Sequence, residues 1–222
     1  GSKAFLVNRM IEFTRNRASA TPTVKVLGLG SAGCNVVDRL ILDGFPEPRG
    51  VTVLEKRQDA ASRLDLHRRR LMLEPRGHAE MYGALPVPAA APAAFGVLFM
   101  HHSGFSTMCG HAIIALTKLA VETSLVRKSG DIPELTINVP AGKIQARARI
   151  EHGKVVESSF LNVPSFIYLR DRHVEVPGIG RVTFDVAYGG AFYAFVEAST
   201  LELSLVPANS ARLIEYGRRI KH

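Results

Sequence analysis

Hydrophobic residues are most concentrated in the middle of the chain, between residues 104 and 121. A polar turn leads into Cys109, and apolar side chains then follow at helical spacing, at Ile113, Ile114, Leu116, Leu119 and Ala120. A helix that is apolar on most of its surface is buried on most sides. We therefore predict a buried central helix with Cys109 in its first turn.

Alternating apolar and polar positions predict strands on both sides of this helix. The predicted strands are 51–54, 71–73, 81–87 and 96–101 before the helix, and 135–149, 154–162, 174–177, 180–187 and 192–196 after it. Turns are expected at Ala141-Gly142 and His152-Gly153. Two further helices are predicted, a charged one over 59–70 and one that begins at Leu213.

These elements predict an α+β fold in which a mixed or antiparallel sheet wraps around the central helix. Val163-Pro-Ser165 is typical of a boundary between units. We expect a leader and linker over residues 1–22, a first α/β unit over 23–165, and the start of a second unit over 166–222.

Composition favours a soluble globular protein, with 46% hydrophobic and 22% charged residues. The apolar runs are shorter than the roughly 18 residues of a membrane span, and two cysteines do not suggest a disulfide framework. We therefore predict a cytoplasmic protein with no membrane partner. The net charge of +8 comes with short basic runs and no nucleic-acid motif. It predicts solvated basic faces and no nucleic-acid partner.

Cys109 is the candidate catalytic residue. The N-terminus of a helix lowers the pKa of a thiol and also binds carboxylates. A thiolate base and an anion site could thus share one element. Free cysteine is also among the most buried residue types, so the pattern alone leaves a structural role open. His101, His102 and His111 near Cys109 do not match zinc-site spacing, and we predict no metal.

A second motif, Gly28-Leu-Gly30-Ser-Ala-Gly33, lies between a predicted strand and a predicted helix, and Glu55 follows the next predicted strand. This is the pattern of a dinucleotide site, in which Gly28, Gly30 and Gly33 approach the phosphates and an acid binds the ribose. No further Rossmann units follow. We favour a glycine turn that serves only the fold, and predict no cofactor; a nucleotide-binding or non-catalytic module remains the alternative.

Several motifs together resemble the proline racemase superfamily, which contains proline racemases, hydroxyproline 2-epimerases and trans-3-hydroxy-L-proline dehydratases. They are Met108-Cys-Gly-His111, Glu74-Pro-Arg-Gly-His78, Met81-Tyr-Gly83, Glu55-Lys-Arg57, Arg69-Arg-Leu-Met72, Thr136-Ile-Asn-Val-Pro-Ala-Gly142, Asn162-Val-Pro-Ser-Phe166 and Asp185-Val-Ala-Tyr-Gly-Gly-Ala-Phe-Tyr-Ala194. The resemblance covers the chain from about Gly44 onward. It departs from the family over 24–43, where the usual Asp-x-His-Thr-x-Gly-Glu-Pro run is missing.

The resemblance implies a diaminopimelate-epimerase-like fold, in which two pseudo-symmetric α/β halves close around one substrate. Cys109 would abstract the Cα proton of a proline or hydroxyproline without pyridoxal phosphate. The backbone amides of Gly110 and His111 would hold the substrate carboxylate. Tyr82 would form an aromatic wall against the ring, and the His111 side chain could bind the ring substituent or the carboxylate.

Within this family, Ala112 after Cys-Gly-His, together with segments 68–78 and 188–194, favours dehydration of trans-3-hydroxy-L-proline, a lyase reaction. Proline racemase or 4-hydroxyproline 2-epimerase activity, both isomerase reactions, remains the alternative. The family's second catalytic residue, a Cys or a Thr, would fall beyond His222. The second half is thus expected to be truncated, and the chain alone to be inactive; a homodimer remains open.

Overall fold

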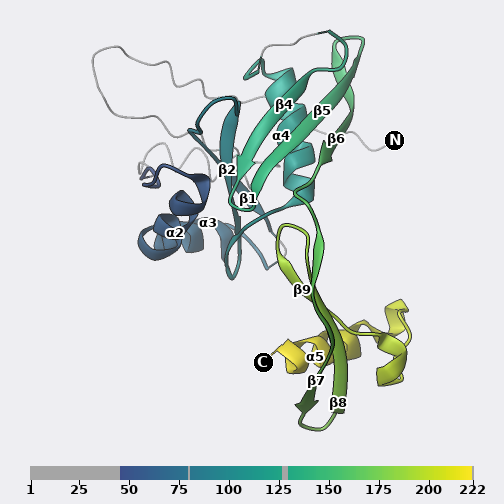
Figure 1. The fold of residues 1–222 in the computed structure, drawn as a ribbon. Helices are drawn as coiled ribbons and strands as arrows, with labels where there is room; N and C mark the ends of the chain where they lie inside the picture. Colours follow the sequence, from purple (N-terminus) through teal and green to yellow (C-terminus); the bar gives the residue numbers. More distant parts are fainter. Residues whose placement is uncertain (1–45, 80, 127–129, 222) are drawn as a thin grey trace. The chain divides into compact units, whose positions relative to one another are not determined.

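The computed structural model describes residues 46–79, 81–126 and 130–221 (Figure 1). The chain divides into two compact units, residues 1–163 and 164–222, and each is described here by itself. The predicted leader and the glycine motif at 28–33 lie outside the described residues.

The first unit contains a mixed sheet with helices packed against it. Its elements are α2 (Val53–Arg63), α3 (Asp65–Met72), β1 (Gly83–Val87), β2 (Phe95–His101), β3 (Gly104–Ser106), α4 (Gly110–Glu122), β4 (Glu134–Val139), β5 (Gly142–Glu151) and β6 (Lys154–Leu161). The strand order is β1-β2-β4-β5-β6, and β3 pairs with β2. Only the β2–β4 pairing is parallel among these. The predicted α+β class with a mixed sheet is confirmed.

The predicted hairpins of β4, β5 and β6 are present. Val139 pairs with Gly142 across a two-residue loop. His152 and Gly153 both have positive φ, 51° and 77°, as the type I′ turn of a two-residue hairpin requires. In β5 the residues Ile144, Ala146 and Ala148 are buried while their neighbours are exposed. Helix α4 packs against β5 and β6 (Figure 1).

Helix α4 matches the predicted central helix, but it is buried on fewer sides than predicted. Ile113 is fully buried, whereas the neighbouring Ile114 is 45% exposed. The buried residues of α4 are Ala112, Ile113, Leu116, Thr117, Ala120 and Val121. The Thr117 hydroxyl is buried and donates to the Ile113 carbonyl at 2.7 Å. The apolar residues of α4 therefore extend beyond the face that packs against the sheet.

Strand β2 is buried along its whole length except at His101. Leu98 and Met100 belong to a core cluster with residues of α2 and α3. Because side chains alternate along a strand, Val97 and Phe99 face the opposite side of the sheet, and both are fully buried. A strand covered on both faces has a continuous apolar sequence, which explains the run from 95 to 100.

Two predicted strands before β1 are wrong. Residues 51–54 lead into α2, because Thr52 caps the helix and forms a capping box with Glu55. Leu71 and Met72 belong to α3 and face the core. The single predicted helix over 59–70 is two helices that meet at Leu64. Short apolar runs do not distinguish strands from the buried face of a helix.

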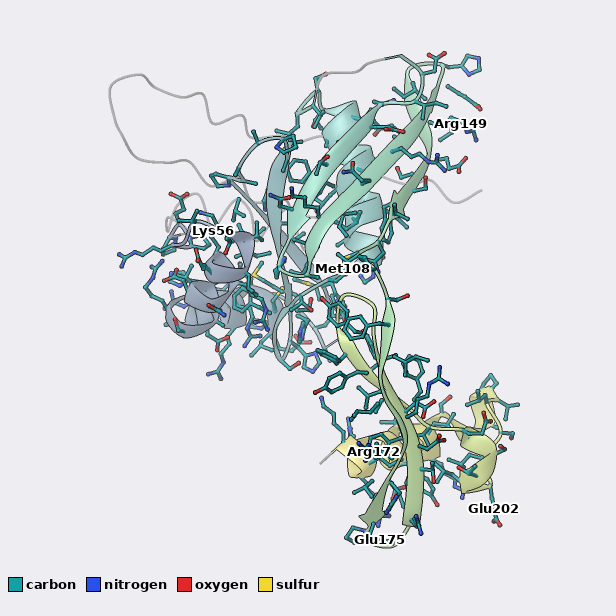
Figure 2. The ribbon with its side chains drawn as sticks, viewed as in Figure 1. Lys56, Met108, Arg149, Arg172, Glu175 and Glu202 are labelled. Atoms are coloured by element: carbon teal, nitrogen blue, oxygen red, sulfur yellow. The ribbon has the colours of Figure 1, made fainter. Side chains whose placement is uncertain are left out.

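The second unit is a three-stranded antiparallel sheet in the order β7-β8-β9, followed by short helices. Its elements are β7 (Phe166–Val176), β8 (Gly180–Tyr188), β9 (Phe192–Phe195), η1 (Ala198–Leu201), η2 (Pro207–Asn209) and α5 (Ser210–Lys221). Its buried hydrophobic residues are Val176, Val182 and Leu203. Aromatic rings of Phe166, Tyr168, Tyr188 and Phe192 contact one another at centroid distances of 5.0 to 6.4 Å. Charged side chains such as Arg172, Glu175 and Glu202 lie around it (Figure 2).

Within the described residues, every helix is too short or too polar to cross a membrane.

The packing of α4 gives a matched pair of substitutions. Ile113→Ala removes a fully buried side chain and should lower the free energy of unfolding by roughly 2 to 5 kcal/mol, through lost burial and the cavity left behind. Ile114→Ala, at the exposed neighbour, should change it by less than about 0.5 kcal/mol. Urea unfolding followed by circular dichroism measures both. Equal losses for the two variants would contradict the orientation of α4.

Candidate active site

Cys109 is the N-cap residue of α4, one position before the predicted first turn. Its backbone is extended, with φ −148° and ψ 104°, and its carbonyl accepts the N–H of Ile113 at 3.1 Å. The thiol is 6% exposed. Met108, the residue before it, lies at one end of the first unit's sheet, far from Arg149 near the other end (Figure 2). The extended chain thus delivers the thiol directly to the N-terminus of the buried helix.

The electrostatic prediction for Cys109 is wrong in its direction. Burial raises the pKa of the Cys109 thiol above its ordinary value, and a hydrogen bond from the backbone N–H of Ala112 acts in the opposite direction. Desolvation disfavours the charged thiolate and outweighs the Ala112 hydrogen bond here. The sequence predicts the helix terminus but not how deeply the sulfur is buried. Burial therefore favours the protonated thiol over the thiolate.

Cys109, His111 and Tyr82 lie together, as the sequence predicts. The Cys109 Sγ is 3.5 Å from both Nδ1 and Nε2 of His111. The Tyr82 ring meets the His111 ring edge-on, with centroids 5.0 Å apart and planes at 81°. Tyr82, just before β1, is 49% exposed, and its ring also contacts His101 at 5.8 Å. An aromatic surface therefore lies beside the thiol and remains open to solvent.

Gly110 opens α4 beneath an aromatic ring that the sequence did not indicate. A Cβ atom at Gly110 would come within 3.2 Å of the Phe160 ring. Phe160 lies on β6 and reaches the site only through the packing of β6 against α4. The backbone N–H groups of Gly110 and His111 belong to the first turn, where helix geometry provides no carbonyl partner. They can receive an anion such as a carboxylate.

Glu55, the acid that the nucleotide hypothesis assigns to the ribose, is already bonded within the protein. The Glu55 carboxylate accepts the N–H of Val51 at 2.7 Å and that of Thr52 at 3.0 Å. These bonds, that of Thr52 first, lower the pKa of Glu55. The carboxylate therefore caps α2 and is not placed to bind a ribose. Gly28, Gly30 and Gly33 lie outside the described residues.

In the parts of the chain that the structure describes, no group of three or more His, Cys, Asp or Glu residues is arranged to hold a metal ion. The cluster at Cys109 combines one buried thiol, one imidazole, one phenol and the first-turn amides of α4. Such a set can exchange a proton with a small anionic molecule.

Comparison with known proteins defines the class of this fold and site. Residues 29–222 match the proline racemase family. The chain belongs to that family.

Two curated relatives are named for the same activity. The chain is 53% identical over 184 residues to trans-3-hydroxy-L-proline dehydratase of Colwellia psychrerythraea, covering 82% of this chain and 52% of the relative. It is 46% identical over 180 residues to trans-L-3-hydroxyproline dehydratase of Xenopus tropicalis, covering 80% and 51%. The chain thus spans about half the length of the curated relatives it matches.

Two crystal structures are similar to the chain. One is a probable proline racemase from Agrobacterium radiobacter with bound carbonate, with TM-score 0.73 and 29% identity, over 78% of this chain and 52% of that one. The other is a hydroxyproline epimerase from Agrobacterium vitis with bound trans-4-hydroxy-L-proline, with TM-score 0.72 and 27% identity over the same shares.

The burial of Cys109 predicts its pH dependence. In a Cys34→Ser background, Cys109 is the one remaining thiol. Its alkylation by iodoacetamide should reach half its maximal rate above about pH 8.5, where an ordinary thiol titrates, because burial raises the pKa of this thiol. Rates across pH, beside those of a short cysteine peptide, measure this. A midpoint below that of the peptide would show that the helix terminus outweighs burial.

The capping role of Glu55 predicts the outcome of a ligand test. NAD, FAD and GTP at millimolar concentration should leave the melting temperature unchanged. A ligand present at a hundred times its dissociation constant would add about 2.7 kcal/mol of stability and be seen easily. Differential scanning fluorimetry measures this, with Glu55→Gln as a control for the loss of the cap. A clear shift with one nucleotide would restore the nucleotide hypothesis.

Proposed function

We propose that the protein dehydrates trans-3-hydroxy-L-proline without pyridoxal phosphate, with Cys109 as the base. The observation that carries the proposal is the buried thiol at the N-cap of α4, 3.5 Å from the His111 ring and beside first-turn amides for which the helix provides no carbonyl partner. The names of the two relatives support this substrate. Because the chain spans about half of each relative, the activity of the whole protein is part of the proposal.

The reaction begins with removal of the Cα proton, which is weakly acidic because nothing in the substrate delocalises the electron pair except the carboxylate. A thiol with a raised pKa forms a thiolate that is a stronger base, at the cost of a smaller thiolate fraction. The Ala112 N–H that reaches the sulfur offsets part of this cost. Burial of Cys109 also keeps water away from the thiolate.

The substrate carboxylate would bind at the first turn of α4. The amides of Gly110 and His111 point out of the helix terminus, and the helix dipole favours an anion there. As the proton leaves, charge moves onto the carboxylate oxygens, and donors already in place stabilise that charge. Tyr82, just before β1, and Phe160, on β6, would enclose the ring.

The second step is departure of the C3 hydroxyl. The electron pair left at Cα forms the Cα–C3 double bond, and hydroxide leaves with a proton as water, which gives Δ2-pyrroline-2-carboxylate. His111, exposed and within 3.5 Å of the thiol, would donate that proton or bind the hydroxyl. Dehydration returns no proton to Cα. It therefore needs a base on one face of the substrate only, the face that Cys109 approaches.

Racemisation or epimerisation is the second candidate function, since the two similar crystal structures are described as a probable proline racemase and a hydroxyproline epimerase. Those reactions return a proton to the opposite face of Cα and need a second acid there. In this proposal the chain forms one diaminopimelate-epimerase-like half around α4, residues 23–165, together with the start of a second half. The second acid would come from outside residues 23–165. A homodimer and a cytoplasmic location stay predictions.

The protein that carries this chain should form pyrroline product from trans-3-hydroxy-L-proline, detected by reaction with 2-aminobenzaldehyde or by mass loss of water. Cys109→Ser should lower kcat by roughly 10²- to 10⁴-fold, which is the usual contribution of a general base. Cys34→Ser is the matched control and should retain activity.

L-Proline and trans-4-hydroxy-L-proline in D₂O separate the two functions. A racemase or epimerase would change the optical rotation and incorporate deuterium at Cα without loss of water. That result, with no pyrroline from the 3-hydroxy substrate, would replace dehydration by the second candidate. No turnover of any of the three substrates would contradict both.

A further inference from the structure

We infer that Arg57, on α2, is a positioning residue for Cys109. Only the predicted change in kcat rests on the proposed function. The Arg57 guanidinium donates twice to the backbone carbonyl of Phe105, from Nε at 3.0 Å and from Nη2 at 2.6 Å. Phe105 lies on β3, four residues before Cys109. A side chain 48 positions before Phe105 in the sequence thus holds the segment that leads to the thiol.

The carbonyls of this segment are held at alternate residues by three different elements. Phe105 is held by Arg57 of α2. Thr107 accepts the N–H of Ala141, in the loop between β4 and β5, at 3.2 Å. Cys109 accepts the N–H of Ile113 in α4 at 3.1 Å. The extended chain is thereby fixed on both sides of Met108. Of the hydrogen bonds to these three carbonyls, only the two from Arg57 come from a side chain.

A second arginine fixes the other end of the same hairpin. Arg68 of α3 is 5% exposed and donates from Nη1 to the carbonyls of His101 and His102, both at 2.7 Å. Its Nε donates to Asp65 at 2.7 Å. The turn it holds carries His101, whose ring contacts Tyr82. The β2–β3 hairpin is therefore fixed at its turn by α3 and at its departing strand by α2.

Arg57 differs from Arg68 in having no carboxylate partner among the ion pairs of the described residues. Its half-buried charge is directed to one neutral carbonyl. Hydrogen bonds from charged donors are stronger than neutral ones, and a planar guanidinium orients its acceptor in a way that the single ammonium of lysine does not. The role of the Arg57 guanidinium is therefore to fix the position of the Phe105 carbonyl, and not to neutralise a carboxylate.

The experiment compares Arg57→Ala and Arg57→Lys with Lys118→Ala in the protein that carries this chain. Lys118 is the control for loss of a side-chain bond to a backbone carbonyl, because its Nζ donates to the Val155 carbonyl at 2.8 Å; unlike Arg57, it also pairs with the Glu122 carboxylate at 3.2 Å. It makes the same kind of bond within the same unit, but near the C-terminal end of α4. Each variant is assayed for kcat, KM and alkylation of Cys109, at a temperature well below its melting transition.

We expect Arg57→Ala to lower kcat by roughly 10²-fold, the loss that a misplacement of about 1 Å can cause, with little change in KM. The alkylation rate of Cys109 at high pH should rise by about one to two powers of ten, because the lost charged hydrogen bond opposed opening of the segment. Arg57→Lys should lie between Arg57→Ala and the parent. Lys118→Ala should leave both measurements unchanged, even with a similar fall in melting temperature.

Two results would overturn the inference. Arg57→Ala could retain the parent's kcat and alkylation rate, or Lys118→Ala could reproduce both changes, as a general loss of stability would. The alkylation arm needs no substrate. If the parent protein turns over no substrate, the proposed function fails, and a rise in alkylation confined to the Arg57 variants still supports the positioning role.

Discussion

The burial of α4 against β5 and β6 is the constraint on which the site depends. Ile113, Leu116 and Ala120 can leave water only if the helix lies along the sheet. This fixes the helix axis and therefore the place of its N-terminus. The first-turn amides that no carbonyl can satisfy are then presented beside Phe160. The proposed anion site therefore depends on the packing of an apolar helix, with Cys109 at the N-cap of that helix.

Burial also sets the chemistry of the thiol. The same packing that excludes water from Cys109 raises the pKa of its thiol, which favours the protonated thiol and makes the thiolate a stronger base. Geometry has to compensate for the small thiolate fraction. His111, the Ala112 amide and the fixed carbonyls of residues 105, 107 and 109 supply that geometry, each from the local backbone or from a neighbouring element.

Membership of the proline racemase family agrees with what the motifs imply. In the proposed mechanism Cys109, Gly110 and His111 are adjacent because one helix terminus would provide both the base and the anion site. Family membership does not by itself choose between dehydration and racemisation, because both begin with the same proton transfer. In the proposed function, residues outside the first unit would decide the fate of the carbanion.

The sequence by itself determined the elements whose signals are local. Alternation and turn residues predicted β4, β5 and β6, and the apolar spacing after Cys109 predicted α4. A short apolar run fits either a strand or the buried face of a helix, and the sequence does not show which. The start of α2 was therefore predicted as a strand at residues 51–54. Only the tertiary structure decided the depth of Cys109, the exposure of Ile114, and the contacts of Phe160 and Arg57. These depend on residues about 50 positions apart, which no local pattern relates.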